Sequence, residues 1–201
     1  MLNVSERKEL YAFFVTLFSY PDNELPAELE RGNGNRIAGL FNAQQPPEVA
    51  AAQLEELQTA FTDLFINRLG GAPAPPYGSV YLETGERLMG ASTESVEAAY
   101  SGEGLSVEGA VEPADYLPTE LEFLYFLVDQ EEAALMRGDV GKARSAAQKQ
   151  ADFCRALLHP WVPEFCRRIM DDRSAHPFYA WGAGLLEQFC ESEKNWLDRR
   201  V

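Results

Sequence analysis

The sequence predicts an all-α fold of roughly nine to eleven helices around a central apolar helix. Over most of its 201 residues, apolar side chains recur three or four positions apart, which is the spacing of one helical face. The segment 115–137 is apolar on nearly every face in its first half, as is typical of a helix covered by others on all sides. No pair of alternating apolar segments indicates a sheet.

The first third of the chain is expected to hold four helical segments. The first begins at Asn3 or Ser5, either of which can cap a helix, and ends before Pro21. The run GNGN at 32–35 is expected to be a turn, because Gly and Asn tolerate positive φ. The other helical segments are a weak helix at 26–31, a short turn of helix at 36–42 and a strong helix at 47–65.

Residues 70–112 are expected to be less regular. A stiff Pro-rich loop covers 70–78, and SVYL at 79–82 is expected to be an ordered extended segment, since it has no evident partner strand. A helix is expected at 93–100. Residues 1–201 are expected to form one domain, which is either undivided or made of two lobes. The acidic, Gly-rich segment 101–112 is the candidate hinge between such lobes.

The stretch EPADYLPTELEFLYFL at 112–127 opens the central helix. Asp115 is expected to be its N-cap, accepting a hydrogen bond from the Leu117 N–H, with Pro118 at the third helical position. A start at Pro113 would place Pro118 in the helix interior at a cost of ~3 kcal/mol, and gives a kinked helix as the alternative. The last helices are expected at 115–137, ending at Gly138, and then at 139–158, 164–171 and 177–197.

The charge balance is strongly acidic, with 32 Asp and Glu against 17 Lys and Arg and a formal net charge of −15. Such a surface repels nucleic acid and anionic membranes and favours basic partners, although acidity also serves solubility alone. Residues 1–21 are amphipathic rather than a signal peptide, and no segment approaches the length of a membrane span. We therefore expect a soluble protein without nucleic-acid binding or membrane insertion.

Catalytic and metal-binding motifs are missing from the sequence. Its three cysteines form no CxxC, and its two histidines form no metal-ligand pair, so buried thiols and no metal are expected. No phosphate-binding glycine loop occurs. The neighbouring acids at 131–132 and 171–172 point about 100° apart on a helix, so neither pair converges on a reacting atom. The sequence predicts neither an enzyme nor a bound cofactor.

Aromatic and acidic residues near loops are the remaining candidates for function. Tyr77 and Tyr81 flank the Pro-rich loop, and Trp161 lies in the helix break HPWVP. Such aromatics more often belong to a core. The functional alternative is a groove in which the rings hold apolar side chains of a peptide, while Glu112 and Asp115 meet its guanidinium groups.

The opening of the central helix resembles the signature E-P-x-D-H-L-x-x-E-L-x-F-L of the TorD/DmsD/NarJ family, the system-specific chaperones of molybdenum redox enzymes. The matching positions are Glu112, Pro113, Asp115, Leu117, Glu120, Leu121, Phe123 and Leu124. Residues 61–90, 159–169 and 178–189 are also similar to family patterns, in the right order. One departure is Tyr116, which stands where the family usually has His and cannot become a cation near neutral pH.

The resemblance implies an all-helical, cytoplasmic protein that is not an enzyme. It implies binding of the twin-arginine signal peptide, or of the apo form, of a molybdopterin oxidoreductase catalytic subunit, until the cofactor is inserted before export. A client that is not exported is the first alternative, and a nucleotide-hydrolysing enzyme is the second. Weak guanine-nucleotide binding is implied by the resemblance alone. A monomer and a domain-swapped dimer both remain open.

The site expected from this resemblance combines acids with aromatic rings. Pro113, Leu117 and Pro118 are expected to fix its geometry, and Glu120 is either a further acid of the same surface patch or a solvated acid of the first helical turn. The residues expected to bind the peptide are Tyr77, Tyr81, Glu112, Asp115, Tyr116, Glu120 and Trp161.

Overall fold

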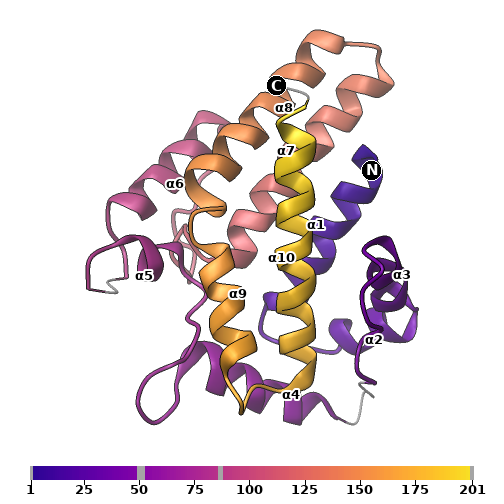
Figure 1. The fold of residues 1–201 in the computed structure, drawn as a ribbon. Coiled ribbons are helices and arrows are strands. Elements are labelled where there is room, and N and C mark those ends of the chain that lie inside the picture. The colour runs from indigo at the N-terminus through magenta and orange to yellow at the C-terminus, as the bar shows by residue number, and fades with distance from the viewer. Residues whose placement is uncertain (1, 49–52, 86–87, 200–201) are drawn as a thin grey trace. The chain divides into compact units, whose positions relative to one another are not determined.

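A computed structural model describes residues 2–48, 53–85 and 88–199 and confirms the all-α fold (Figure 1). Ten α-helices, α1 to α10, lie within these ranges, and the described residues form no strand. Their one isolated β-bridge pairs Tyr77 with Tyr116. None of the described helices is both long and apolar enough to cross a membrane.

The chain forms two compact units and passes from one to the other four times along its length. The first unit comprises Met1–Val15, Tyr77–Val162 and Cys190–Val201, and the second comprises Thr16–Pro76 and Pro163–Phe189. The segment 101–112 lies inside the first unit, between two of its helices. A hinge at this segment stays a prediction.

Helix α7 is the apolar centre of the first unit. Its side chains are buried on several faces, and Phe123 packs against Tyr100 and Phe153 with ring centroids 4.7 and 4.9 Å apart. Gly138, with φ 71°, ends α7 in the left-handed conformation that the sequence predicted. The helices of this unit are α5 (Gly78–Leu82), α6 (Ala91–Gly102), α7 (Leu117–Met136) and α8 (Val140–Phe153), followed by a π-helical turn (Cys154–Leu158), with the first part of α1 (Val4–Phe18) and the last part of α10 (Pro177–Leu197).

A buried ion cluster joins four of these helices. The side chain of Arg7 on α1 is fully buried, and its guanidinium donates to Glu193 on α10 through two bonds of 2.6 Å. It also donates to Glu131 on α7 at 3.2 Å and to Gln150 on α8 at 2.6 Å, and it lies 3.6 Å from the centre of the Trp196 ring. Every guanidinium nitrogen therefore has a partner in the interior.

The second unit has an aromatic core. Phe65 stands 4.7 Å from Phe61 and 5.4 Å from Tyr179, measured between ring centroids, and Phe18 stands 5.5 Å from Phe165. Its helices are α2 (Glu24–Glu30), α3 (Asn33–Leu40), α4 (Leu54–Phe61) and most of α9 (Val162–Asp171), with a π-helical turn (Thr62–Ile66) and the remaining parts of α1 and α10.

Three expected elements of the chain differ in the structure. Only Gly32, with φ 80°, takes the left-handed conformation of the expected turn at 32–35, so α3 begins at once with Asn33. Residues 49–52 of the helix expected at 47–65 lie outside the described residues, and the helix described there begins at Leu54. The segment 79–82 is helical in α5 rather than extended, because a distant carboxylate supplies its cap.

Candidate functional site

Asp115, in the loop before α7, accepts hydrogen bonds from the start of α5. Its buried carboxylate accepts a 2.6 Å hydrogen bond from the Ser79 N–H and a 3.0 Å bond from the Thr93 hydroxyl. Its backbone carbonyl accepts a 2.9 Å bond from the Gly78 N–H. Two amide groups of the first turn of α5, which have no partner within their own helix, are thereby satisfied.

The expected role of Asp115 as N-cap of its own helix is therefore wrong. Helix α7 begins at Leu117, the residue before it is Tyr116, and no side chain caps it. Pro118 falls in the first turn, where its missing N–H has no intrahelical partner to lose. Asp115 lies inside a turn closed by a 3.1 Å bond from the Tyr116 N–H to the Pro113 carbonyl, and its carboxylate caps α5 instead of α7.

Tyr77, Glu112 and Tyr116 form a cluster that reaches solvent, here called the tyrosine–glutamate cluster. The Tyr77 hydroxyl donates a 2.7 Å hydrogen bond to the exposed Glu112 carboxylate. The rings of Tyr77 and Tyr116 lie 5.5 Å apart, tilted by 35°, next to the β-bridge between the two residues. Burial and the Glu112 charge raise the pKa of both phenols, so both stay protonated near neutral pH.

Glu120 lies beneath this surface and not on it. Its side chain is 1% exposed, close to Gly78 and to the fully buried Trp161. Burial and the Asp115 charge raise the pKa of Glu120 well above its usual value, and they outweigh the influence of the nearby Trp161 indole N–H, which lowers it. Both expected roles of Glu120 as a solvated acid are therefore wrong, because Trp161 and the start of α5 pack against its carboxylate.

Tyr81 and Trp161 form a stacked pair beside Glu120. Their ring centroids lie 5.3 Å apart with an interplanar angle of 23°. Tyr81 is half-buried, whereas Trp161 is fully buried. A Cβ on Gly78 would stand 3.1 Å from the Trp161 indole nitrogen, so this close packing favours glycine at the start of α5.

The structure brings the residues expected to bind the peptide together within the first unit, but it exposes only some of them. The tyrosine–glutamate cluster and part of Tyr81 reach solvent. Asp115, Glu120 and Trp161 are buried and can act on a ligand only by positioning the exposed groups. Of the residues expected to fix the geometry, Leu117 and Pro118 are buried, and Pro113 is half-buried.

Ser79, Thr93 and Met89 were missed by sequence reasoning. The Met89 N–H donates a 3.2 Å hydrogen bond to the Ser79 hydroxyl, and Met89 takes a left-handed φ of 62° with its side chain 66% exposed. A left-handed conformation is uncommon for residues other than glycine. Ser79 and Met89 lie within the segment 61–90 that matches family patterns. The match did not indicate their hydrogen bond, which only the fold shows.

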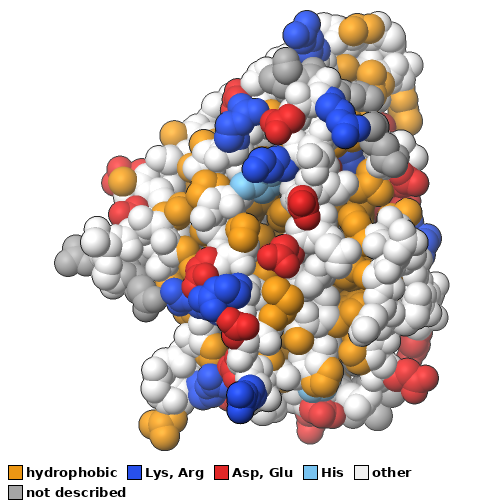
Figure 2. All heavy atoms as spheres, in the orientation of Figure 1, with side chains coloured by type: hydrophobic (Ala, Val, Ile, Leu, Met, Phe, Trp, Pro, Cys, Tyr) orange, Lys and Arg blue, Asp and Glu red, His pale blue; other side chains and the backbone are white. Residues whose placement is uncertain are grey.

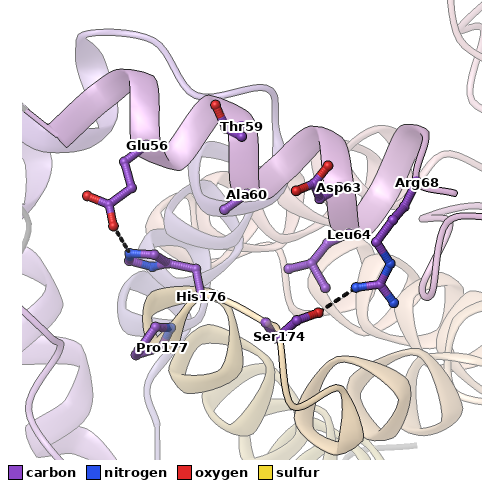
Figure 3. A pocket seen from close by; sticks show the side chains of 10 residues that line it. Glu56, Thr59, Ala60, Asp63, Leu64, Arg68, Ser174, His176 and Pro177 are labelled. Carbon is purple, nitrogen blue, oxygen red and sulfur yellow. Dashed lines mark hydrogen bonds and ion pairs between the residues drawn. The ribbon is translucent and has the colours of Figure 1, made fainter.

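A separate pocket of about 690 Å³ lies in the second unit (Figure 3). Residues of α4 and the following π-helical turn form one wall, and residues 174–177 form the other. Polar contacts join the walls at two places: His176 lies 3.6 Å from Glu56, and Arg68 donates to Ser174 at 2.6 Å. No residue expected to bind the peptide lines this pocket.

Comparisons with known proteins place the chain in a family. The sequence model of the nitrate reductase delta subunit family matches residues 22–167. The chaperone protein TorD of Vibrio cholerae (strain O395) is 32% identical over 151 residues, which span 75% of this chain and 66% of that protein, just under two thirds of its length. The TorD of Vibrio parahaemolyticus is 29% identical over 209 residues, covering 96% of this chain and 94% of that protein.

A solved structure agrees with the sequence comparisons. A redox enzyme maturation protein from Archaeoglobus fulgidus superposes with a TM-score of 0.56 and 25% sequence identity, over 96% of this chain and 93% of that one. The resemblance read from the sequence motifs is thereby confirmed, and the chain belongs to the nitrate reductase delta subunit family, which includes the TorD chaperones.

Proposed function

We propose that this protein is a cytoplasmic chaperone that binds the N-terminal segment of a molybdopterin oxidoreductase catalytic subunit. The segment is the client's twin-arginine signal peptide, and the protein holds it until the cofactor is inserted and export can begin. The chaperone names of the curated relatives support this proposal, as does the maturation role named for the structural neighbour. The protein acts by binding and not by catalysis.

The observation that carries the proposal is the tyrosine–glutamate cluster. Glu112 presents an exposed carboxylate beside the tilted rings of Tyr77 and Tyr116. A guanidinium can bind a carboxylate through two parallel hydrogen bonds and can also stack on a tyrosine ring. An arginine therefore finds a charge partner and an aromatic face in one place.

Exposed apolar side chains lie on segments that are hydrogen-bonded to the residues around this cluster or adjoin it in the chain. Met89 is held to Ser79, and Ser79 to Asp115, by the hydrogen bonds described above. Leu82 at the end of α5 is 38% exposed, and Val111, next to Glu112 in the chain, is 97% exposed. Burying apolar surface contributes ~25 cal/mol per Å², and a methionine adapts to irregular partners. These side chains suit the apolar stretch that follows the arginines of a signal peptide.

The buried residues of the site act as its scaffold. Asp115 fixes α5, and thereby Tyr77 at its start, relative to Tyr116. This replaces the expectation that Asp115 itself meets a guanidinium, since its carboxylate is buried and already accepts two hydrogen bonds. Side chains locked by their packing lose less entropy when a ligand binds.

Peptide titration of the full chain tests the proposal. A twin-arginine peptide is titrated by calorimetry into the parent protein, Glu112→Gln and the control Glu97→Gln, which changes an exposed acid of α6. Glu112→Gln is expected to weaken binding by roughly 5- to 10-fold, as for loss of one charge-assisted contact, while the control binds as the parent does. Equal affinities for all three proteins would remove Glu112 from the site.

A client that is not exported would use the same surface with a different peptide. The mature N-terminus of such a client lacks the arginine pair, so its binding would depend on the apolar residues alone. A peptide in which both arginines are replaced by glutamine separates the two cases. Unchanged affinity for this peptide would favour the client that is not exported, and a marked loss would favour the twin-arginine client.

A further inference from the structure

The first unit carries a positive region on a chain that is otherwise acidic. Residues 137–160 and 190–199 together hold seven basic side chains and five acidic ones, a local balance of +2, whereas the whole chain carries −15. Figure 2 shows Lys and Arg side chains gathered over α8 and the last part of α10. This balance repels anions less than the strongly acidic average of the chain does.

A pocket of about 380 Å³ opens within this region. Its apolar side chains come from the end of α8, the π-helical turn after it and the end of α10, and its polar ones are Arg155, His159, Lys194 and Asp198. The apolar lining consists of Ala151, Cys154, Pro160 and Leu197. Binding sites for small molecules typically combine an apolar wall with a few convergent polar groups in this way.

The cations at the pocket have capacity for a further anion. The Arg155 guanidinium lies 3.2 Å from Asp198 and 3.8 Å from Asp152, and its side chain remains 60% exposed. The Lys194 ammonium makes no ion pair with any residue that the structure describes. Partly exposed pairs of this kind are weak and rearrange at little cost.

His159 supplies a polar atom that lacks a partner. Its Nε2 atom is buried and makes no hydrogen bond within the described part of the chain. Burial lowers the pKa of His159; Lys194 and Arg155 lower it further, while Glu193 and Asp198 act in the opposite direction. A buried imidazole nitrogen without a partner costs free energy that a ligand oxygen would recover.

We propose that this pocket binds a small oxyanion, a carboxylate or a phosphate, that carries an apolar body. Lys194 and Arg155 hold the anionic group, His159 donates a hydrogen bond to it from Nε2, and the apolar body lies against Cys154, Pro160 and Leu197. The anion stabilises the imidazolium, so the complex takes up a proton at His159 as it forms. The site is separate from the tyrosine–glutamate cluster and goes beyond the proposed chaperone function.

Four probes test the chemistry of the pocket on the full chain: benzoate, phenyl phosphate, inorganic phosphate and phenol. Calorimetry and ¹H–¹⁵N NMR are expected to show saturable binding of at least one of the first two. Inorganic phosphate and phenol, which each lack one half of the proposed ligand, are expected to bind at least roughly 10-fold more weakly. Benzoate and phenyl phosphate separate a carboxylate source from a phosphate source. Failure of both to saturate would overturn the proposal.

Variants locate the bound probe. Lys194→Gln is expected to weaken binding by roughly 5- to 10-fold, while Lys142→Gln, at an exposed lysine of α8 that does not line the pocket, leaves it unchanged. Equal effects of the two variants would show non-specific attraction to the positive region and overturn the site. The twin-arginine peptide is expected to bind Lys194→Gln as it binds the parent protein.

The proton uptake gives an independent readout. Benzoate stays ionised between about pH 8 and about pH 6, so tighter binding towards pH 6 reports the protonation of His159. His159→Asn is expected to remove this pH dependence. Far-ultraviolet circular dichroism checks that Lys194→Gln and His159→Asn keep the helical content of the parent protein. Affinity that is independent of pH in the parent protein would contradict the role of His159.

Discussion

The Asp115 carboxylate accepts a hydrogen bond from the Ser79 N–H at 2.6 Å, so a residue just before α7 caps the start of α5. The two residues are 36 positions apart in the chain. Together with the bond from the Gly78 N–H to the Asp115 carbonyl, this contact holds a five-residue helix that is too short to be stable by itself. The position of Tyr77, and with it the tyrosine–glutamate cluster, depends on it.

Asp115→Asn is expected to lower the free energy of unfolding by about 1–2 kcal/mol. The asparagine side chain keeps one acceptor oxygen, but its NH₂ group cannot accept a hydrogen bond. One of the two donors, the Ser79 N–H or the Thr93 hydroxyl, therefore loses its acceptor. Urea unfolding followed by circular dichroism measures the change, with Asp63→Asn, at an exposed acid of the second unit, as the control. Coincident unfolding curves for parent and Asp115→Asn would show that the contact does not stabilise the fold.

Glu120→Gln is expected to flatten the pH dependence of stability. The pKa of Glu120 is raised in the folded state, so folding takes up a proton once pH exceeds the ordinary carboxyl pKa, and this cost grows as pH rises towards the folded value. Glutamine resembles the neutral acid and carries no such cost. Compared with the parent, the variant should gain stability between about pH 5 and about pH 8 in urea unfolding. A constant difference across this range would mean that Glu120 is ionised in the folded protein.

Arg7→Met is expected to destabilise the protein by about 3–5 kcal/mol. The change leaves the Glu131 and Glu193 carboxylates buried without their cation. Lys8→Met is the matched control on the next position of α1, because the Lys8 ammonium pairs with Asp129 and Glu132 nearer the surface and should contribute much less. Similar unfolding midpoints for the two variants would show that the buried cluster adds little to stability.

Regular helices could be predicted from the sequence because their signals are local. The end of α7 at Gly138 and the whole of α10 follow from turn residues and apolar spacing within a few positions. The cap on α5 could not be predicted, since its partner lies in a distant segment. The buried state of Glu120 was missed for a related reason: a first-turn acid is usually solvated, and only the packing of Trp161 and α5 over it excludes water.

The residues of the candidate site could be predicted from the sequence, but which of them are exposed to solvent could not. The resemblance to family patterns gathered Tyr77, Glu112, Asp115 and Trp161 before any geometry was known. Which of them face solvent depends on tertiary packing, and that separates the exposed Glu112 from the buried Asp115. Arg7 lies in the segment that the sequence shows to be amphipathic, and only the fold shows that it is the fully buried cation of the first unit's ion cluster.

The most direct measurement of the central claim is a double-mutant cycle between Glu112 and the arginine pair of the peptide. The parent protein and Glu112→Gln are each titrated with the twin-arginine peptide and with its glutamine counterpart. If the arginines bind at Glu112, the two changes are not additive, and the coupling free energy is about 1 kcal/mol or more. Additive effects, with a coupling near zero, would show that the arginines bind elsewhere and would contradict the proposed site.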